Sequence, residues 1–312
     1  MQRRDILKLC GAAGLSLSTP IGRSLLGNDD LPQGELPFYG GPYYVVFNAS
    51  GGWDTTYLMD PKGTTESNRL YEQGEILSEG NHRLAPNASH IDSGMSNEDF
   101  FKNYGDSLLV LNGLDYSVNN HSPCSRYMAT GKLDSLSYPT FAALVAACNG
   151  GEVPLAFLTF GNYSSTGNLV ALARVPYLSS LNRLANADGV QGSARNPYHD
   201  DFVSERIEKA LQSQMQSRLL KRRLPRVERS QNMLYAAQLN SKALQRVTPF
   251  VPKSSPKERL SRQADIALAS FKAGVCVSAN LSIGQFDSHS NNDRDQMKLI
   301  PELLAGVDYL LK

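Results

Sequence analysis

The sequence predicts an α/β fold in which a mainly parallel sheet is sandwiched by helices. Short, continuous apolar runs rich in β-favouring residues recur along the 312-residue chain, and such runs are typical of strands buried on both faces of a sheet. Between them lie longer segments with apolar residues at spacings of three and four, the pattern of helices that bury one face. Strands that alternate with helices favour a parallel sheet.

Five apolar runs are expected to form the strands. They are residues 43–47, 108–111, 155–160, 169–173 and 275–283. In an open α/β sheet the ligand site lies beyond the carboxyl ends of the strands. The polar segments that follow residues 47, 111 and 283 are therefore expected to share one rim of the sheet.

Five further segments are expected to be helical, because their apolar residues repeat with helical spacing. They are residues 138–148, 200–224, 231–247, 257–274 and 293–312. The block from about residue 200 to residue 274 would form a helical layer that covers the sheet.

The first residues are typical of a targeting segment. Arg3 and Arg4 precede a hydrophobic pair and a lysine, and residues 9–18 are uncharged and rich in Ala, Gly, Leu and Ser. This segment resembles the bacterial twin-arginine export signal, and its apolar part is shorter than the about 20 residues that a membrane span needs. We therefore expect a signal peptide over residues 1–30, a single domain over 31–312, and a periplasmic or otherwise exported protein without a stable membrane span. The alternative is an N-terminal helix of a cytosolic protein.

Charge and composition exclude several classes of protein. Lys and Arg number 31 against 30 Asp and Glu, which argues against nucleic-acid binding driven by bulk charge. A hydrophobic fraction of 41% argues against a disordered chain. Four cysteines are too few for a disulfide-dense scaffold. The sequence also lacks a Gly-x-Ser-x-Gly nucleophile elbow, a P-loop motif and a dinucleotide-binding glycine motif.

Asp54 is the first candidate metal ligand. It ends the sequence Gly51-Gly52-Trp53-Asp54, which follows the expected strand 43–47. Glycines let the backbone turn tightly after a buried strand, and a carboxylate at this edge of the sheet can bind a metal ion. The alternative is an ordinary turn.

His121, Ser122 and Cys124 are the candidate catalytic residues. They come where a loop is expected to enter a helix. Imidazole, hydroxyl and thiol groups at a helix N-terminus lie in positive potential, which favours an activated nucleophile or a bound oxyanion. Arg126 and Lys132 are expected to add contacts to an anion. The alternative is simple helix capping by a serine.

Asp287 and His289 follow the expected strand 275–283 as an Asp-x-His sequence. A carboxylate and an imidazole at this spacing can bind one cation, and Zn²⁺ and Mn²⁺ accept both kinds of ligand. We therefore predict Asp54, Asp287 and His289 as ligands of a divalent metal ion, with Zn, Mn or Ca as the candidates.

Together these segments resemble exported bacterial sulfatase-like proteins, a family of unknown function in the alkaline phosphatase superfamily. The resemblance is carried by the Gly-Gly-Trp-Asp54 strand end, by His121 nine residues before a Thr-Gly pair, and by Gln-Phe-Asp287-Ser-His289. It implies a metal centre at the strand ends and hydrolysis of a small anionic phosphate or sulfate ester by an activated nucleophile. It also implies that Asp54 is the first metal ligand and that Asp287 and His289 are the later pair.

Two departures from the family pattern bear on function. His121 takes the position of the sulfatase nucleophile, and Ser125 takes that of the arginine. The further metal ligands that the family has downstream are absent up to Lys312, which predicts a domain that is incomplete at its C-terminus. The alternative functions are therefore a non-catalytic periplasmic binding or scaffold protein on a degenerate hydrolase fold, and an inactive truncated fragment.

Overall fold

The computed structural model describes residues 38–86, 94–115, 117–161, 163–187, 189–190, 197–219 and 241–312. The expected signal peptide lies outside these residues. So does the stretch 220–240, which includes the end of the expected helix 200–224 and most of the expected helix 231–247.

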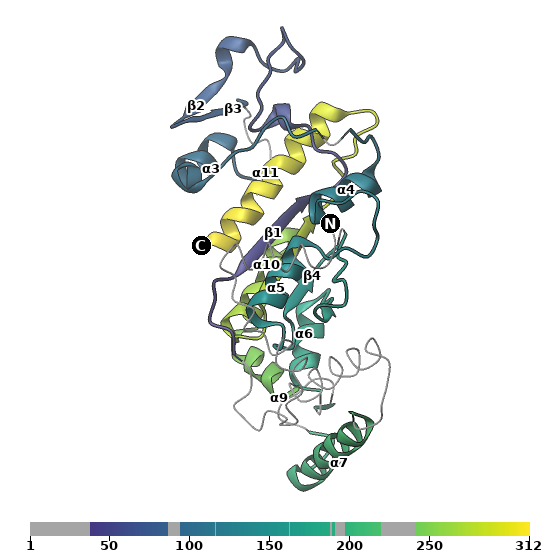
Figure 1. The fold of residues 1–312 in the computed structure, drawn as a ribbon. Helices are drawn as coiled ribbons and strands as arrows, with labels where there is room; N and C mark the ends of the chain where they lie inside the picture. The colour runs from purple at the N-terminus through teal and green to yellow at the C-terminus, as the bar shows by residue number, and fades with distance from the viewer. Residues whose placement is uncertain are drawn as a thin grey trace.

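A four-stranded sheet forms the centre of the molecule (Figure 1). Its order is β1 (Tyr44–Ala49), β6 (Ser278–Ile283), β4 (Phe157–Thr159) and β5 (Leu172–Ala173), and every neighbouring pair is parallel. β1 and β6 pair along their full length, from Tyr44 opposite Ser278 to Ala49 opposite Ile283. The loops that follow these two strands therefore meet at one edge. The predicted α/β class with a parallel sheet is confirmed.

Helices cover both faces of this sheet, as two-sided burial of parallel strands requires. The alanine-rich α5 (Phe141–Gly150) packs on one face in an apolar cluster with Phe157. On the other face α10 (Arg259–Lys272) packs against Leu281 and its neighbours, and α11 (Asn292–Leu311) packs against α10. β6 lies between these layers, and five of its six residues are buried.

The remaining elements surround the sheet. The larger ones are α3 (Asn97–Tyr104), α4 (His121–Thr130), α6 (Leu178–Ala185), α7 (Asp201–Leu219), α9 (Ser241–Leu244) and the antiparallel pair β2 (Leu77–Glu79) and β3 (His82–Leu84). Within the described residues there are also four short 3-10 turns: η1 (Thr55–Tyr57), η2 (Gln73–Glu75), η3 (Gly105–Ser107) and η5 (Gln245–Phe250).

The prediction of a strand at residues 108–111 is wrong. The chain is irregular there, and Leu109 and Leu111 are 83% and 67% exposed. An apolar run becomes a strand only where another strand accepts and donates its backbone hydrogen bonds, and none of the strands described pairs with this segment.

Most expected helices are present, but their packing differs from the expectation. α5, α10 and α11 lie within three residues of the predicted bounds, whereas the expected helix 231–247 ends in a 3-10 turn that runs from residue 245 to residue 250. Within the block 200–274, α10 covers the sheet. α7 lies at the far end of the molecule (Figure 1), and apolar side chains such as Phe202 and Ile207 are exposed there.

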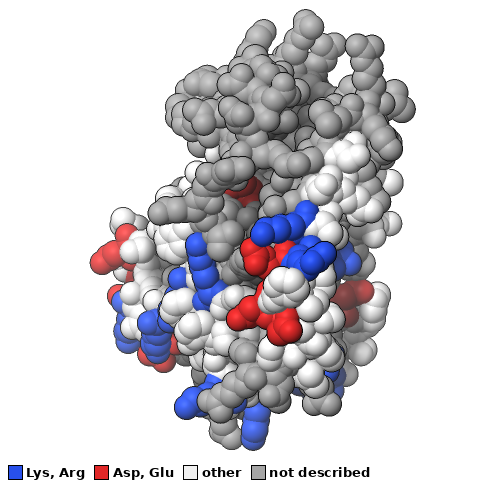
Figure 2. Space-filling model, turned by 90° about the horizontal axis from the view of Figure 1, so that it is seen from below, with Lys and Arg blue, Asp and Glu red and all other residues white. Residues whose placement is uncertain are grey.

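Surface charge follows the near balance of the composition. On the described part of the face in Figure 2, Lys and Arg side chains lie beside Asp and Glu side chains. This mixture matches the formal net charge of +1 and offers no broad basic surface there for nucleic acid. No helix in the described part of the chain combines the length and apolar character that a membrane span requires.

Candidate functional site

Two segments far apart in the sequence meet at the carboxyl edge of the sheet. His121 is the first residue of α4, and Asp287 and His289 lie in the loop after β6. Nε2 of His121 and Nε2 of His289 are each 3.1 Å from Oδ2 of Asp287. One carboxylate oxygen therefore holds two imidazoles. We call these three residues the His–Asp–His cluster.

The cluster is open to solvent. The side chain of Asp287 is 43% exposed, and those of His121 and His289 are 61% and 87% exposed. A ligand in solution can therefore reach the imidazoles without a conformational change in the sheet.

The position of Asp287 is set by its neighbours along the chain. Phe286 is buried at 1% exposure, and its backbone N–H donates to the Ser50 carbonyl at the end of β1. Gly51 has a φ of +113°, and an added Cβ would lie 2.7 Å from the Asp287 backbone nitrogen. Glycine is therefore required where the loops after β1 and β6 pass each other.

Gln296, on α11, ties these loops together. It is 1% exposed, its Oε1 accepts from the Asp54 N–H at 3.1 Å, and its Nε2 donates to the Phe286 carbonyl at 3.2 Å. Nε2 also donates to Asn292 Oδ1, one helical turn earlier. Because buried polar groups need partners, this amide fixes the two loops relative to α11.

Asp54 belongs to this network. Its Oδ1 accepts from the backbone and hydroxyl of Thr56 at 3.0 and 2.7 Å, and its Oδ2 accepts from Asn292 Nδ2 at 3.1 Å. The carboxylate caps η1. Among the residues described, no hydrogen bond or ion pair joins Asp54 to the His–Asp–His cluster.

Of the other candidates on α4, Ser122 is exposed beside His121, and its N–H donates to the Asn120 side chain that caps the helix. The Cys124 thiol donates to the Val118 carbonyl at 3.0 Å, and this thiol is half-buried.

The two basic candidates have local contacts. Arg126 donates to the Leu133 carbonyl at 2.6 Å, while its buried Nε has no partner in the described part of the chain. Lys132 pairs with Asp134 at 3.3 Å and lies over the Tyr138 ring.

A second charged group stands at the start of α11. Asp293 accepts from the Tyr57 hydroxyl at 2.5 Å and from the Arg69 guanidinium at 2.8 Å. These hydrogen bonds, that of Tyr57 first, lower the pKa of Asp293. Burial and the same carboxylate raise the pKa of Tyr57, so the phenol stays neutral.

The donor types of the His–Asp–His cluster suit a divalent ion, because Zn²⁺ accepts imidazole nitrogen and carboxylate oxygen. The arrangement of these side chains does not suit a metal ion. Within the residues described, no group of three or more His, Cys, Asp and Glu side chains is placed so that it could hold a metal ion. The two 3.1 Å contacts are hydrogen-bond distances, and Asp54 is engaged elsewhere.

Sequence reasoning missed the supporting residues Asn292 and Gln296. From the sequence alone these two residues were assigned no role. The signal lies in their spacing, because both fall on the same helical face as Leu299 and Leu303, which are buried. A polar residue in register with the apolar face of a helix predicts a buried hydrogen-bond network.

Comparison with known proteins identifies no relative of this chain. No family model, no curated protein and no solved structure matches this chain.

Proposed function

We propose that this protein is an exported hydrolase of phosphate or sulfate esters, of the sulfatase-like type within the alkaline phosphatase superfamily. The observation that supports it most is the His–Asp–His cluster, in which the first residue of α4 and two residues after β6 converge at the carboxyl edge of a parallel sheet. Open α/β sheets bind ligands at this edge.

The cluster is suited to proton transfer. Asp287 accepts a hydrogen bond from Nε2 of an imidazole, so the Nδ1 atom of that neutral ring is left as a proton acceptor. His121 would then take the proton from an attacking hydroxyl, either that of the adjacent exposed Ser122 or that of water. The protonated His121 would then return that proton to the leaving oxygen, while His289 shares the Asp287 carboxylate.

A divalent ion is part of the proposal. Asp287 and His289 would supply ligands to it, and the ion would stabilise charge on the attacking or leaving oxygen when bound. Because the two side chains now bond to each other, the His289 imidazole would have to turn to receive the ion. Asp54 would join them only by releasing Asn292.

The test is a hydrolysis assay on residues 31–312 with aryl phosphate, phosphodiester and aryl sulfate substrates, with Zn²⁺, Mn²⁺ or Ca²⁺ added. Asp287→Ala and His289→Ala should each lower the rate by about 100-fold or more, the usual size of an acid–base contribution. Asp106→Ala, an exposed aspartate in η3, is the matched control. Equal rates in wild type and Asp287→Ala would exclude the proposal.

A second candidate function is a non-catalytic periplasmic binding protein. It is favoured by the Asp54 carboxylate, whose two oxygens already have partners within the fold. Calorimetric titration with Zn²⁺ separates the two functions. Stoichiometric binding that is lost in Asp287→Ala and His289→Ala supports the hydrolase, whereas a stable fold without binding supports the alternative.

Export is proposed from the arginine pair and the uncharged stretch that follows it. Replacing Arg3 and Arg4 by lysine should retain the protein in the cytoplasm of a bacterial host, as shown by fractionation. Unchanged recovery from the periplasm would argue against the twin-arginine route.

A further inference from the structure

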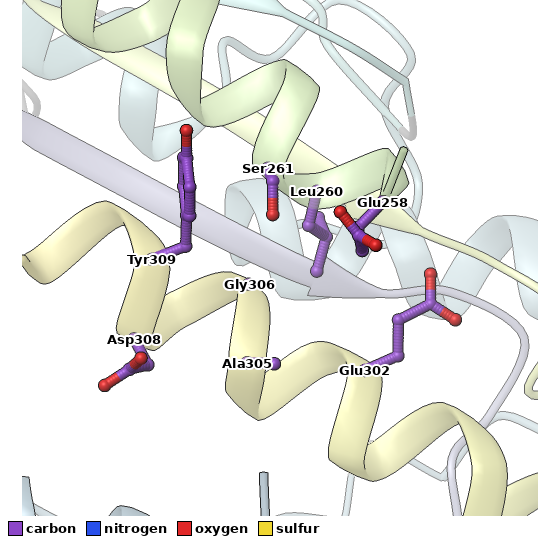
Figure 3. A pocket seen from close by; sticks show the side chains of 8 residues that line it. All are labelled: Glu258, Leu260, Ser261, Glu302, Ala305, Gly306, Asp308 and Tyr309. Carbon is purple, nitrogen blue, oxygen red and sulfur yellow. The ribbon is translucent and has the colours of Figure 1, made fainter. Parts of the chain in front are cut away.

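A cavity between α10 and α11 lies apart from the His–Asp–His cluster (Figure 3). It has a volume of about 200 Å³, and residues of both helices line it. Leu260, Ala305 and Gly306 give it an apolar floor, and Glu258 and Glu302 bring carboxylates to it from opposite helices.

The close crossing of the two helices shapes this cavity. Gly306 is buried, and an added Cβ would lie 2.5 Å from Cβ of Leu260. Small residues at a crossing let helices approach until backbone and side chain touch. The groove beside this contact is thus walled by α10 on one side and α11 on the other.

The cavity carries uncompensated negative charge. The side chains of Glu258 and Glu302 form no hydrogen bond or ion pair with another described residue. The third carboxylate, that of Asp308, already pairs with Lys312 at 2.8 Å and points away from α10 in Figure 3. Glu258 and Glu302 thus bring two negative charges to the cavity, so a positive ligand is favoured.

Ser261 points to a ligand independently of this charge. The residue is 6% exposed, its hydroxyl is directed toward α11 in Figure 3, and it has no hydrogen bond to another described residue. The fully buried side-chain atoms without a partner lie elsewhere in the described residues, so the Ser261 hydroxyl is open to the cavity. A ligand with an N–H donor in the cavity would hydrogen-bond to it.

Tyr309 is held in place at the cavity wall. Its hydroxyl donates to Asp265 Oδ1 at 2.7 Å, and Asp265 is 6% exposed. This hydrogen bond, more than burial, raises the pKa of Tyr309 to about 12, so the ring stays neutral. A neutral aromatic ring beside carboxylates is a favourable wall for an organic cation.

We propose that this cavity binds an alkylammonium group, with the ammonium at Glu258, Glu302 and Ser261 and the methylenes on Leu260 and Ala305. An organic cation fits better than a metal ion, because within the described residues no three acidic side chains are placed to hold one. The ammonium group would come either from a free primary amine or from a lysine side chain of another protein.

The proposal is tested by calorimetric titration of the folded protein with pentylamine, with 1-pentanol as the neutral control. Pentylamine should bind at one site, more weakly as salt is added, and 1-pentanol should not bind. Glu302→Gln should weaken binding about fivefold, the size of one partly exposed charge contact. Glu66→Gln, an exposed carboxylate on another loop, should leave it unchanged.

A second variant tests whether pentylamine binds inside the cavity or only near its charges. Ala305→Leu fills the cavity and should abolish binding, while circular dichroism checks that each variant is folded. Binding of 1-pentanol equal to that of pentylamine, or wild-type affinity in Glu302→Gln, overturns the proposal. Nα-acetyl-lysine methylamide distinguishes the sources, because it matches or exceeds pentylamine if the natural ligand is a protein lysine and binds more weakly if it is a free amine.

Discussion

The two sides of the His–Asp–His cluster are built very differently. On one side, the loops after β1 and β6 are fixed by buried Phe286, by Gly51 and by the Gln296 amide. On the other side, α4 has no buried residue, and the preceding segment exposes Leu109 and Leu111.

The comparison shows which interactions stabilise each side of the cluster. Asp287 and His289 are positioned by buried groups. Leaving a buried polar group without its hydrogen-bond partner lowers the stability of the fold. His121 is positioned by a helix with a half-buried surface and by its contact with Asp287. Substitutions of the buried groups that hold the β1–β6 side should therefore lower the free energy of unfolding, whereas substitutions on α4 should change it little.

The largest effect is expected for Gly51→Ala. An alanine at this position has a strained backbone φ, and its methyl group lies 2.7 Å from the Asp287 backbone nitrogen. The free energy of unfolding in urea should therefore fall by about 3 kcal/mol. Gly52→Ala is the control, because its φ of +79° is also positive but nothing lies within 4 Å of the added atom. Equal losses in the two variants would mean that the close approach of the loops is unimportant.

Gln296→Ala should have the next largest effect and lower the free energy of unfolding in urea by about 2–3 kcal/mol. It leaves the Asp54 N–H and the Phe286 carbonyl without their partner in a buried place. Asn149→Ala removes an exposed amide at the end of α5 and should cost under about 0.5 kcal/mol. A loss for Gln296→Ala as small as that of the control would contradict the proposed role of the buried amide.

Asp293→Asn should cost about 1–2 kcal/mol at neutral pH, because the carboxylate loses charged hydrogen bonds from Tyr57 and Arg69. The pKa of Asp293 is lowered in the folded state, so its contribution is present above the unfolded value and is lost as pH falls through the folded value. Stability measured from pH 6 downward should therefore fall more steeply below about pH 4 in wild type than in Asp293→Asn. Parallel curves would refute this linkage.

The smallest effect is expected on the α4 side. Met128 is 61% exposed, and Met128→Ala should change stability by no more than about 0.5 kcal/mol in urea unfolding. A loss above about 2 kcal/mol would show that α4 is packed against the protein in solution and would remove the contrast between the two sides.

Sequence alone predicted the parts of the fold that depend on continuous burial. The apolar run that ends at Ile283 predicted β6, and its place in a parallel sheet predicted that Asp287 and His289 would lie at the rim. The same rule failed at residues 108–111, because apolar character does not reveal whether a neighbouring strand exists. The short helices α3 and α6 were missed, since eight residues give little periodic signal.

Within the site, sequence predicted the residue types but not their partners. His121 was expected to be catalytic, at the position of the sulfatase nucleophile, and the structure places it against Asp287. Asp54 was expected beside Asp287, and the structure gives it Asn292 and Thr56. Such pairings depend on the crossing of α11 over the ends of β1 and β6, which no local pattern encodes.

The most direct test of the proposed hydrolase is a double-mutant cycle on ester hydrolysis with His121→Asn and Asp287→Asn. If both residues act in one catalytic unit, each single variant loses most of the rate and the double variant loses little more. Losses that simply multiply, or single variants that retain the wild-type rate, would contradict a shared site built from α4 and the loop after β6.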